Sequence, residues 1–534
     1  MRIAAPFGAF FAIAFGLLGC ANRVPVPSPE LQGKSVMSLR AELDSGRITS
    51  EALVRAYLER IEALDRQGPT LRAVLSINPD ALDQARALDA ELRQNGPRGL
   101  LHGIPILIKD NIETKDPVPT TAGSLALASN RTSRDAPVVA NLRAAGAVIL
   151  GKANLSEWAN FRSRDSISGW SALGGLTKNP HALDRTPCGS SAGSAVAVAA
   201  GLAAAAVGTE TDGSIVCPAS MNGIVGLKPT LGLLSNRHIV PIAHSQDTAG
   251  AMAIDVRDAA VLLDAMVGQV PACEPPASDC KRADYVQALS TDALRGKRIG
   301  VLRFDRPRQA EIVPIYERAL QVLREGGAQL VEVATPAMAS IYEAESRVLH
   351  TEFKIDLNAY LATLPDTVEV RTLGALIEFN AASPRELALF GQDMFVEANA
   401  TEEDDSYREA LARSKQLAGE QGLRRLLDEH ELDLLVAPTT GTAWRIDIAN
   451  GDQFPGSFST LPAVAGYPHL TVPMGDLYGL PLGLSFIGAP WTEDVLLGAA
   501  YAFEQRANVK LKAQFRPSIE EGHEALERAA LEAQ

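Results

Sequence analysis

The sequence predicts an α/β protein with a mixed, largely parallel central sheet that helices cover on both faces. Two observations predict this fold class. Short apolar strands alternate with helical segments along most of the 534 residues, an order that is typical of parallel crossovers. Only 5% of the residues are aromatic, while stretches rich in alanine and glycine are long, which favours helices packed closely on a sheet.

The composition describes a globular, acidic protein. Hydrophobic residues make up 46% of the chain and charged residues 21%, so neither a disordered nor a fibrous chain is expected. The 50 basic and 64 acidic residues leave a net charge of −14, which repels polyphosphates. We therefore expect no nucleic-acid partner. The sequence does not indicate an oligomeric state.

The N-terminus has the features of an export signal. Arg2 precedes an uncharged apolar run over residues 3–19, which together form a signal peptide over 1–19. The run ends in Leu-Leu-Gly-Cys, which resembles a bacterial lipobox with cleavage before Cys20. A Pro-rich linker follows over 20–35. We expect an exported chain, either periplasmic or anchored to the outer membrane by a lipid on Cys20; plain secretion is the alternative.

The globular part begins with helices and then alternates. Residues 36–95 have helical periodicity, with starts after Thr49 and at Asn78-Pro79, where a capping side chain precedes proline. A strand over 103–108 ends at Lys109. The expected elements that follow are a helix over 136–145, strands over 147–150, 297–304, 329–333, 432–438 and 468–473, and a helix over 312–325.

We interpret residues 36–515 as one domain with a catalytic core over about 100–260. The segment 340–430 is more helical and more charged, and we expect it to be peripheral and to shape a site without supplying its chemistry. Residues 516–534 form a C-terminal tail.

The block 187–230 is dominated by small residues, so its backbone can come close to a ligand. It lacks the phosphate-loop patterns. Residues 189–193 match G-x-S-x-G with Ser191 in the nucleophile position, but an elbow needs a buried strand before it. Residues 179–188 are polar and contain two prolines, which argues against that strand. A Gly/Ala-rich helix packed on the sheet explains 193–206 but does not explain GTETDGS at 208–214.

Taken with Lys109, the block resembles the core of the amidase signature family. The motifs that carry the resemblance are, in order, GIPILIKDNI (103–112), TTAGS (120–124), GSSAGSAVAVAAGL (189–202), GTETDGSIVCPA (208–219) and GIVGLKPT (223–230), with VAPTTG (436–441), AGYPHLTVPMG (465–475) and GLPLGLSFIGAPW (481–493) in the C-terminal half. The resemblance covers about residues 50–510 and is closest in appearance to bacterial peptide amidases. It implies the fold of that family.

The resemblance implies a Ser–cis-Ser–Lys triad of Lys109, Ser190 and Ser214. Ser214 would be the nucleophile, Ser190 the bridging serine, and neutral Lys109 the base. The backbone N–H groups of Thr211, Asp212, Gly213 and Ser214 would form an oxyanion hole. Glu210 replaces the Asp found in many members, a departure that we expect to leave the nucleophile untouched. No cofactor and no metal are expected.

The expected activity is hydrolysis of a carboxylic amide to acid and ammonia through a serine acyl-enzyme, with C-terminal peptide amides as substrates. Other small aliphatic or aryl amides are an alternative. Further alternatives are an esterase that uses Ser191, a noncatalytic binding lipoprotein, and the amidase component of the amidotransferase that acts on charged tRNA. The export signal and the acidic charge oppose the last.

The cysteines leave one question open. Cys188, Cys217, Cys273 and Cys280 are too few for a disulfide scaffold in a chain of this length. Cys273 and Cys280 flank a short Pro-rich loop, which leaves two alternatives open, a bridge between them or two free thiols. No CxxC or HExxH motif supports a zinc site.

Overall fold

A computed structural model describes residues 31–268, 284–304 and 310–520. The expected signal peptide, Cys20 with its lipid, most of the linker and the end of the tail lie outside these residues. So do Cys273 and Cys280. None of the described helices is long and apolar enough to cross a lipid bilayer.

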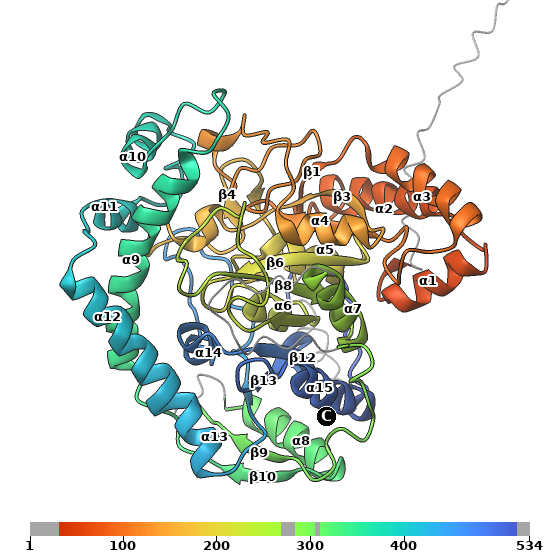
Figure 1. The fold of residues 1–534 in the computed structure, drawn as a ribbon, viewed down its shortest axis with the longest axis vertical. Helices are drawn as coiled ribbons and strands as arrows, with labels where there is room; N and C mark the ends of the chain where they lie inside the picture. The colour runs from red at the N-terminus through yellow and green to blue at the C-terminus, as the bar shows by residue number, and fades with distance from the viewer. Residues whose placement is uncertain (1–30, 269–283, 305–309, 521–534) are drawn as a thin grey trace, which may run out of the picture.

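The centre of the molecule is an 11-stranded sheet in the order β1-β3-β2-β6-β8-β7-β12-β13-β11-β9-β10 (Figure 1). Its strands are β1 (Val74–Ile77), β2 (Pro105–Lys109), β3 (Val148–Ala153), β6 (Ala205–Glu210), β7 (Val225–Lys228), β8 (Thr248–Ala253), β9 (Arg298–Val301), β10 (Gln329–Glu332), β11 (Leu434–Pro438), β12 (His469–Leu477) and β13 (Leu480–Ile487). A separate pair is formed by β4 (Trp170–Ser171) and β5 (Gly175–Leu176).

The α-helices lie around this sheet. They are α1 (Val36–Asp44), α2 (Ser50–Ile61), α3 (Ala81–Asn95), α4 (Pro137–Ala144), α5 (Ala192–Ala199), α6 (Val216–Met221), α7 (Val256–Val267), α8 (Ile312–Glu325), α9 (Ala339–Leu361), α10 (Leu373–Ala382), α11 (Asp393–Asn399), α12 (Asp405–Lys415), α13 (Arg425–Glu429), α14 (Thr460–Ala465) and α15 (Glu493–Ala507). Short helical turns of other types are η2 (Glu62–Arg66), η3 (Leu125–Leu127), η4 (Glu157–Asn160) and η5 (Gln416–Arg424).

The helices cover the sheet on both faces, as the sequence predicts. The helices α5 and α6 contact each other and cover one face of the sheet, from β1 to β13 in the order of the strands in the sheet. The helices α7, α8 and α15 form the layer on the other face. The strands β2, β3, β6, β8 and β13 are buried along their whole length, which is typical of a sheet covered on both faces. The expected mixed sheet with flanking helices is confirmed.

The sheet is less parallel than the helix–strand alternation indicates. Parallel pairings form two groups, β3-β2-β6 and β11-β9-β10, and every pairing between β6 and β11 is antiparallel. The segment 468–473 belongs to β12, which makes a hairpin with β13. Tyr478 and Gly479, both with positive φ, form the two-residue turn between these strands, as primed hairpin turns require.

The N-terminal helical segment also differs in detail from the expectation. It contains the strand β1, which the helical periodicity does not predict. A run of four mainly apolar residues cannot be told from a helical segment by periodicity alone. The helix α2 begins after Thr49, whose side chain accepts from the Ala52 N–H, as predicted. The helix α3 begins later than predicted, at Ala81, because the Asn78 side chain accepts from the Asp80 N–H in a turn that precedes the helix.

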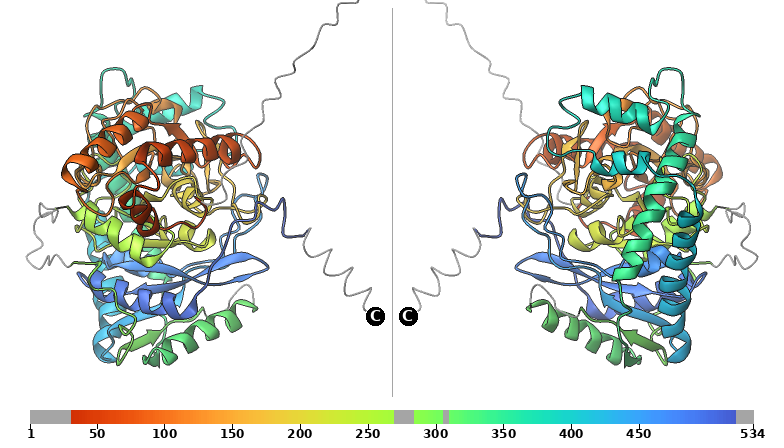
Figure 2. Two further views of the ribbon diagram at one scale, coloured as in Figure 1. Left: turned by 90° about the vertical axis from the view of Figure 1, so that its right-hand side faces the viewer. Right: turned by 90° about the vertical axis from the view of Figure 1, so that its left-hand side faces the viewer.

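The helical segment after β10 lies along one side of the molecule. The long helices α9 and α12 pack against each other there, on the side opposite to α1, α2 and α3 (Figure 1). The right-hand view of Figure 2 looks directly at this pair.

Candidate active site

Lys109 is the last residue of β2 and is completely buried between neighbouring strands. Its Nζ donates to Ser190 Oγ at 2.8 Å and to Thr209 Oγ1 at 2.8 Å. Thr209 lies on β6, the strand next to β2. The predicted strand therefore ends at Lys109, and the side chain of this lysine lies inside the protein.

Ser190 follows a cis peptide bond from Gly189. It is fully buried, and its carbonyl accepts from the Ser156 N–H at 3.0 Å. A Cβ on Gly189 would overlap Ser156 Oγ, so only glycine allows this approach of the two loops. The backbone of Ser190 is therefore fixed by Ser156, and its hydroxyl oxygen accepts the hydrogen bond from Lys109.

Ser214 ends the short loop that leads from β6 to α6. The loop turns at Gly213, which has a φ of +79° and would be strained with any other residue. Thr211, Asp212, Gly213 and Ser214 all line one cavity. The Ser191 N–H donates to the Ser214 carbonyl at 3.1 Å, so the loops of the two serines are directly joined.

Glu210 holds the backbone that follows Ser214. Its Oε2 accepts from the N–H groups of Ile215 at 2.8 Å and Val216 at 3.0 Å, where α6 begins. Ser214 is present despite the Glu210 departure, and the Glu210 carboxylate has a structural role of its own because it fixes the turn that carries Ser214. A sequence motif gives only the residue type, whereas this role depends on which N–H groups the side chain reaches.

Burial sets the electrostatics of the lysine. It lowers the Lys109 pKa to about 7, although the carboxylates of Asp247 and Glu210 act in the opposite direction. A lysine with this pKa is substantially neutral at neutral pH and can accept a proton. Burial likewise raises the pKa of Asp247 to about 7. The Asp247 carboxylate accepts from the Thr211 hydroxyl at 2.6 Å and so anchors the start of the Ser214 loop.

Asp212 anchors the other side of that loop. Its carboxylate accepts from the hydroxyls of Ser459 and Thr460, which lie at the N-terminal end of α14. Gly213 comes close to the same segment, because an added Cβ would lie 2.9 Å from Ser459 Oγ. The C-terminal half of the chain therefore fixes the geometry of the loop 211–214, a role for the Asp212 side chain that the motif does not reveal.

Ser191 is not placed as a nucleophile. Its hydroxyl donates to the Thr209 carbonyl at 3.0 Å and accepts from the Thr209 N–H at 3.2 Å, and the residue is fully buried. Residues 179–188 contain no strand, so the strand that an elbow needs is missing. Ser191 instead joins the start of α5 to β6.

The cavity above Ser214, which we call the main cavity, has a volume of about 620 Å³. Gly189 and the loop 211–214 form its floor. Its walls combine aromatic, other apolar and polar side chains from distant segments: Phe161, Arg164, Tyr342, Leu349, Met394, Trp444, Asp452 and Phe454. Tyr342, Leu349 and Met394 belong to the segment 340–430 that was expected to shape a site.

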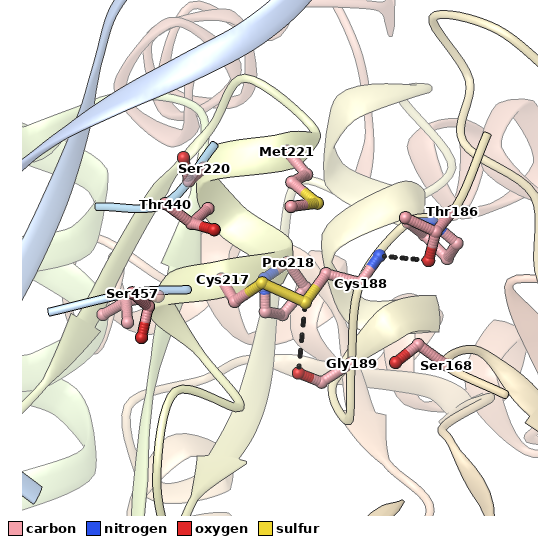
Figure 3. The surroundings of a disulfide bond; sticks show 12 residues. Ser168, Thr186, Cys188, Gly189, Cys217, Pro218, Ser220, Met221, Thr440 and Ser457 are labelled. Atoms are coloured by element: carbon pink, nitrogen blue, oxygen red, sulfur yellow. Dashed lines mark hydrogen bonds between the residues drawn. A yellow bond between two sulfur atoms is a disulfide. The ribbon is translucent and has the colours of Figure 1, made fainter. Parts of the chain in front are cut away.

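A disulfide joins Cys188 to Cys217 in the wall of this cavity. Cys188 directly precedes Gly189, and Cys217 lies in the first turn of α6 (Figure 3). The bridge therefore connects the loop of Ser190 to the helix that follows Ser214. The cysteine count gave no indication of this pair, because the partners are 29 residues apart in sequence and meet only in the fold.

In the described part of the chain, one group of side chains has the spacing of metal ligands. It consists of His244, Glu352 and Asp356. These residues do not line the main cavity, and His244 Nδ1 already contacts an Asp356 carboxylate oxygen at 2.9 Å. The group joins the loop that contains His244 to α9.

Comparison with known proteins gives consistent similarities. A family model described as Amidase matches residues 52–497. A probable amidase of Arabidopsis thaliana is 39% identical over 512 residues, which covers 93% of this chain and 95% of the relative. A glutamyl-tRNA(Gln) amidotransferase subunit of Chloroflexus aurantiacus is 37% identical over 500 residues, which covers 89% of this chain and 97% of the relative. The native peptide amidase from Stenotrophomonas maltophilia is 51% identical, with a TM-score of 0.86 over 90% of this chain and 98% of that chain.

Proposed function

The chain belongs to the amidase family and is an amide hydrolase, and from this premise we propose that it removes the C-terminal carboxamide of peptides with Lys109, Ser190 and Ser214 as its catalytic residues. The observation that carries the triad is the 2.8 Å hydrogen bond between Lys109 Nζ and buried Ser190 Oγ, beside a cavity that both Gly189, the neighbour of Ser190, and Ser214 line.

The geometry supports the following first half-reaction. Neutral Lys109 takes the proton of Ser190, which in turn takes the proton of Ser214 as Ser214 Oγ attacks the amide carbonyl. The backbone N–H groups of the loop 211–214 stabilise the oxyanion that forms. Protonated Lys109 then returns a proton through Ser190 to the departing nitrogen, so that ammonia leaves and the acyl group stays on Ser214.

In the second half-reaction, water attacks the acyl-enzyme. The same relay accepts a proton of this water, and the acid is released with Ser214 restored. Because Lys109 begins and ends the cycle neutral, no net proton is stored in the protein. The fixed positions of Gly189, Glu210 and Asp212 keep the relay and the oxyanion site in place throughout.

Two features favour peptide amides among possible substrates. The chain is 51% identical to the Stenotrophomonas maltophilia peptide amidase, and the main cavity of about 620 Å³ has room for more than one amino acid residue. Its walls also carry both aromatic groups and polar groups, which suits a peptide backbone with varied side chains.

The assignment is tested by measuring ammonia release by the mature chain from three substrate sets: blocked peptide amides, small aliphatic amides and aryl amides. We expect the highest kcat/KM for peptide amides. A higher value for either other set would replace the peptide assignment with that set. Absence of turnover for all three, together with absence of Ser214 labelling by a fluorophosphonate, would favour a binding protein.

We also propose that the chain is exported, on the basis of the apolar segment 3–19 and the lipobox-like sequence before Cys20. Cys20→Ala should block processing or release the mature chain from membranes. Cell fractionation and N-terminal sequencing test this proposal. An unchanged N-terminus and distribution would overturn the lipid anchor and leave plain secretion.

A further inference from the structure

A second cavity of about 200 Å³, which we call the side cavity, opens beside the main cavity. Tyr342, Gly456 and Ser457 line both cavities. Tyr342 lies in the first turn of α9, is 48% exposed and borders both spaces. A chain that extends from the main cavity past Tyr342 therefore reaches the side cavity.

The walls of the side cavity are mainly apolar. Phe304 and Phe458 lie side by side, with ring centroids 4.8 Å apart, and Met338 and Leu461 add further apolar surface, while Thr335 contributes a polar group. Aromatic rings and a thioether make favourable contacts with apolar and aromatic groups. The volume suits a single leucine or phenylalanine side chain.

The one charged side chain among the residues that line the side cavity is already neutralised. Arg303 contacts Glu317 at 2.6 Å and Glu332 at 2.8 Å, and its guanidinium lies over the Tyr316 ring. An acidic substrate side chain would have to displace these carboxylates, and a basic one would meet the guanidinium. The side cavity thus disfavours charged substrate side chains. The main cavity differs, because the carboxylates of Asp212 and Asp452 line it.

We propose that the side cavity is a substrate subsite that binds an apolar side chain of a residue upstream of the carboxamide residue. This proposal rests on the peptide amide function proposed above. The occupant follows from continuity: the main cavity contains the reacting carboxamide, and the remaining peptide extends toward Tyr342. The enzyme should therefore act best on peptide amides that carry an apolar residue at one upstream position.

The first experiment compares substrates with wild-type enzyme. Blocked di-, tri- and tetrapeptide amides share one carboxamide residue and carry alanine, leucine, phenylalanine or glutamate at each upstream position in turn. We expect one position at which leucine or phenylalanine raises kcat/KM roughly 10-fold over alanine, the size of effect that one apolar pocket produces. Glutamate at that position should lower kcat/KM below the alanine value.

The second experiment substitutes Met338, a residue in the wall of the side cavity. Met338→Glu places a charge in the subsite, and Met338→Phe fills it; both should abolish the preference for large apolar residues at that position. Both should lower kcat/KM for the extended apolar peptide amides much more than for an N-blocked amino acid amide, which does not reach the side cavity. Ala339→Glu is the matched control, because Ala339 is the next residue, is exposed and does not line the cavity; its preference should equal that of wild type.

The outcomes separate this proposal from the function on which it rests. If peptide amides are hydrolysed well but no upstream position prefers apolar residues, the subsite is overturned and the proposed function stands. The same holds if the preference survives in both Met338 variants or is lost in Ala339→Glu. If peptide amides are poor substrates while small amides are good ones, both proposals fail.

Discussion

Thr209 should set the pH at which the enzyme becomes active. Its hydroxyl oxygen accepts hydrogen bonds from Lys109 Nζ at 2.8 Å and from Asn111 Nδ2 at 2.9 Å. The bond from lysine is stronger when the lysine is charged, so Thr209 stabilises the ammonium form. Thr209→Val keeps the shape of the side chain and removes the acceptor, which should lower the Lys109 pKa.

The magnitude follows from the two protonation states. A hydrogen bond to a charged group contributes about 1.5–3 kcal/mol and one between neutral groups about 0.5–1.5 kcal/mol. The difference of roughly 1.4 kcal/mol corresponds to about one pKa unit. The Lys109 pKa should therefore move from about 7 to near 6. Since the proposed base Lys109 can accept a proton only when it is neutral, the acid limb of the activity profile should move to lower pH by the same amount.

The assay is kcat/KM against pH, from about pH 5 to pH 9, with a neutral primary amide that does not titrate. Thr209→Ser keeps the acceptor and should keep the wild-type limb. Asp247 also titrates near pH 7 and Glu210 acts on Lys109, but both are unchanged in the two variants. An unmoved limb in Thr209→Val, or an equal shift in Thr209→Ser, would refute this reasoning.

Three further predictions concern the nucleophile, the base and the disulfide. Ser214→Ala should lower kcat by several orders of magnitude and abolish fluorophosphonate labelling, while Ser191→Ala should keep labelling and lose stability; retained labelling in the first variant and loss in the second would reverse the roles. Lys109→Met should raise the free energy of unfolding by on the order of 4 kcal/mol at pH 7, because folding strips a proton from a lysine whose pKa falls to about 7. That gain should shrink as the pH approaches the ordinary lysine pKa, and urea unfolding at pH 7 and pH 10 measures it; a gain independent of pH would contradict the assigned cause. Replacing Cys188 and Cys217 by serine, or reducing the wild type, should lower the free energy of unfolding by roughly 2–4 kcal/mol together with activity, and an unchanged melting temperature and rate would count against a structural bridge.

The sequence predicted the parts of the fold that depend on local pattern. The helix at 312–325 and the strand that ends at Lys109 follow from periodicity and buried apolar runs. The antiparallel centre of the sheet did not, because strand direction depends on pairing between distant segments such as β7 and β12. The resemblance of spaced motifs also brought Lys109 and Ser190 together, which the structure places in direct contact.

The rest of the site depends on contacts that no motif encodes. Asp247 reaches Thr211 from the loop that precedes β8, and Ser459 reaches Asp212 from the C-terminal half. Tyr342 lies on a helix with an ordinary composition, so nothing in its neighbourhood marks it as a cavity wall. Such residues become visible only when the tertiary structure fixes which side chains face the cavity.

The pairing of β7 with β12 has a consequence for synthesis on the ribosome. Strands β1, β2, β3, β6, β7 and β8 are all complete by Ala253, but His469 of β12 pairs with Lys228 and is made about 240 residues later. At a translation rate of about 5–20 residues per second, this interval lasts roughly 10–50 s. During that time β7 would be an open edge that can recruit strands from other nascent chains. The yield of soluble enzyme should therefore depend on how well this edge is shielded until the second half of the sheet arrives.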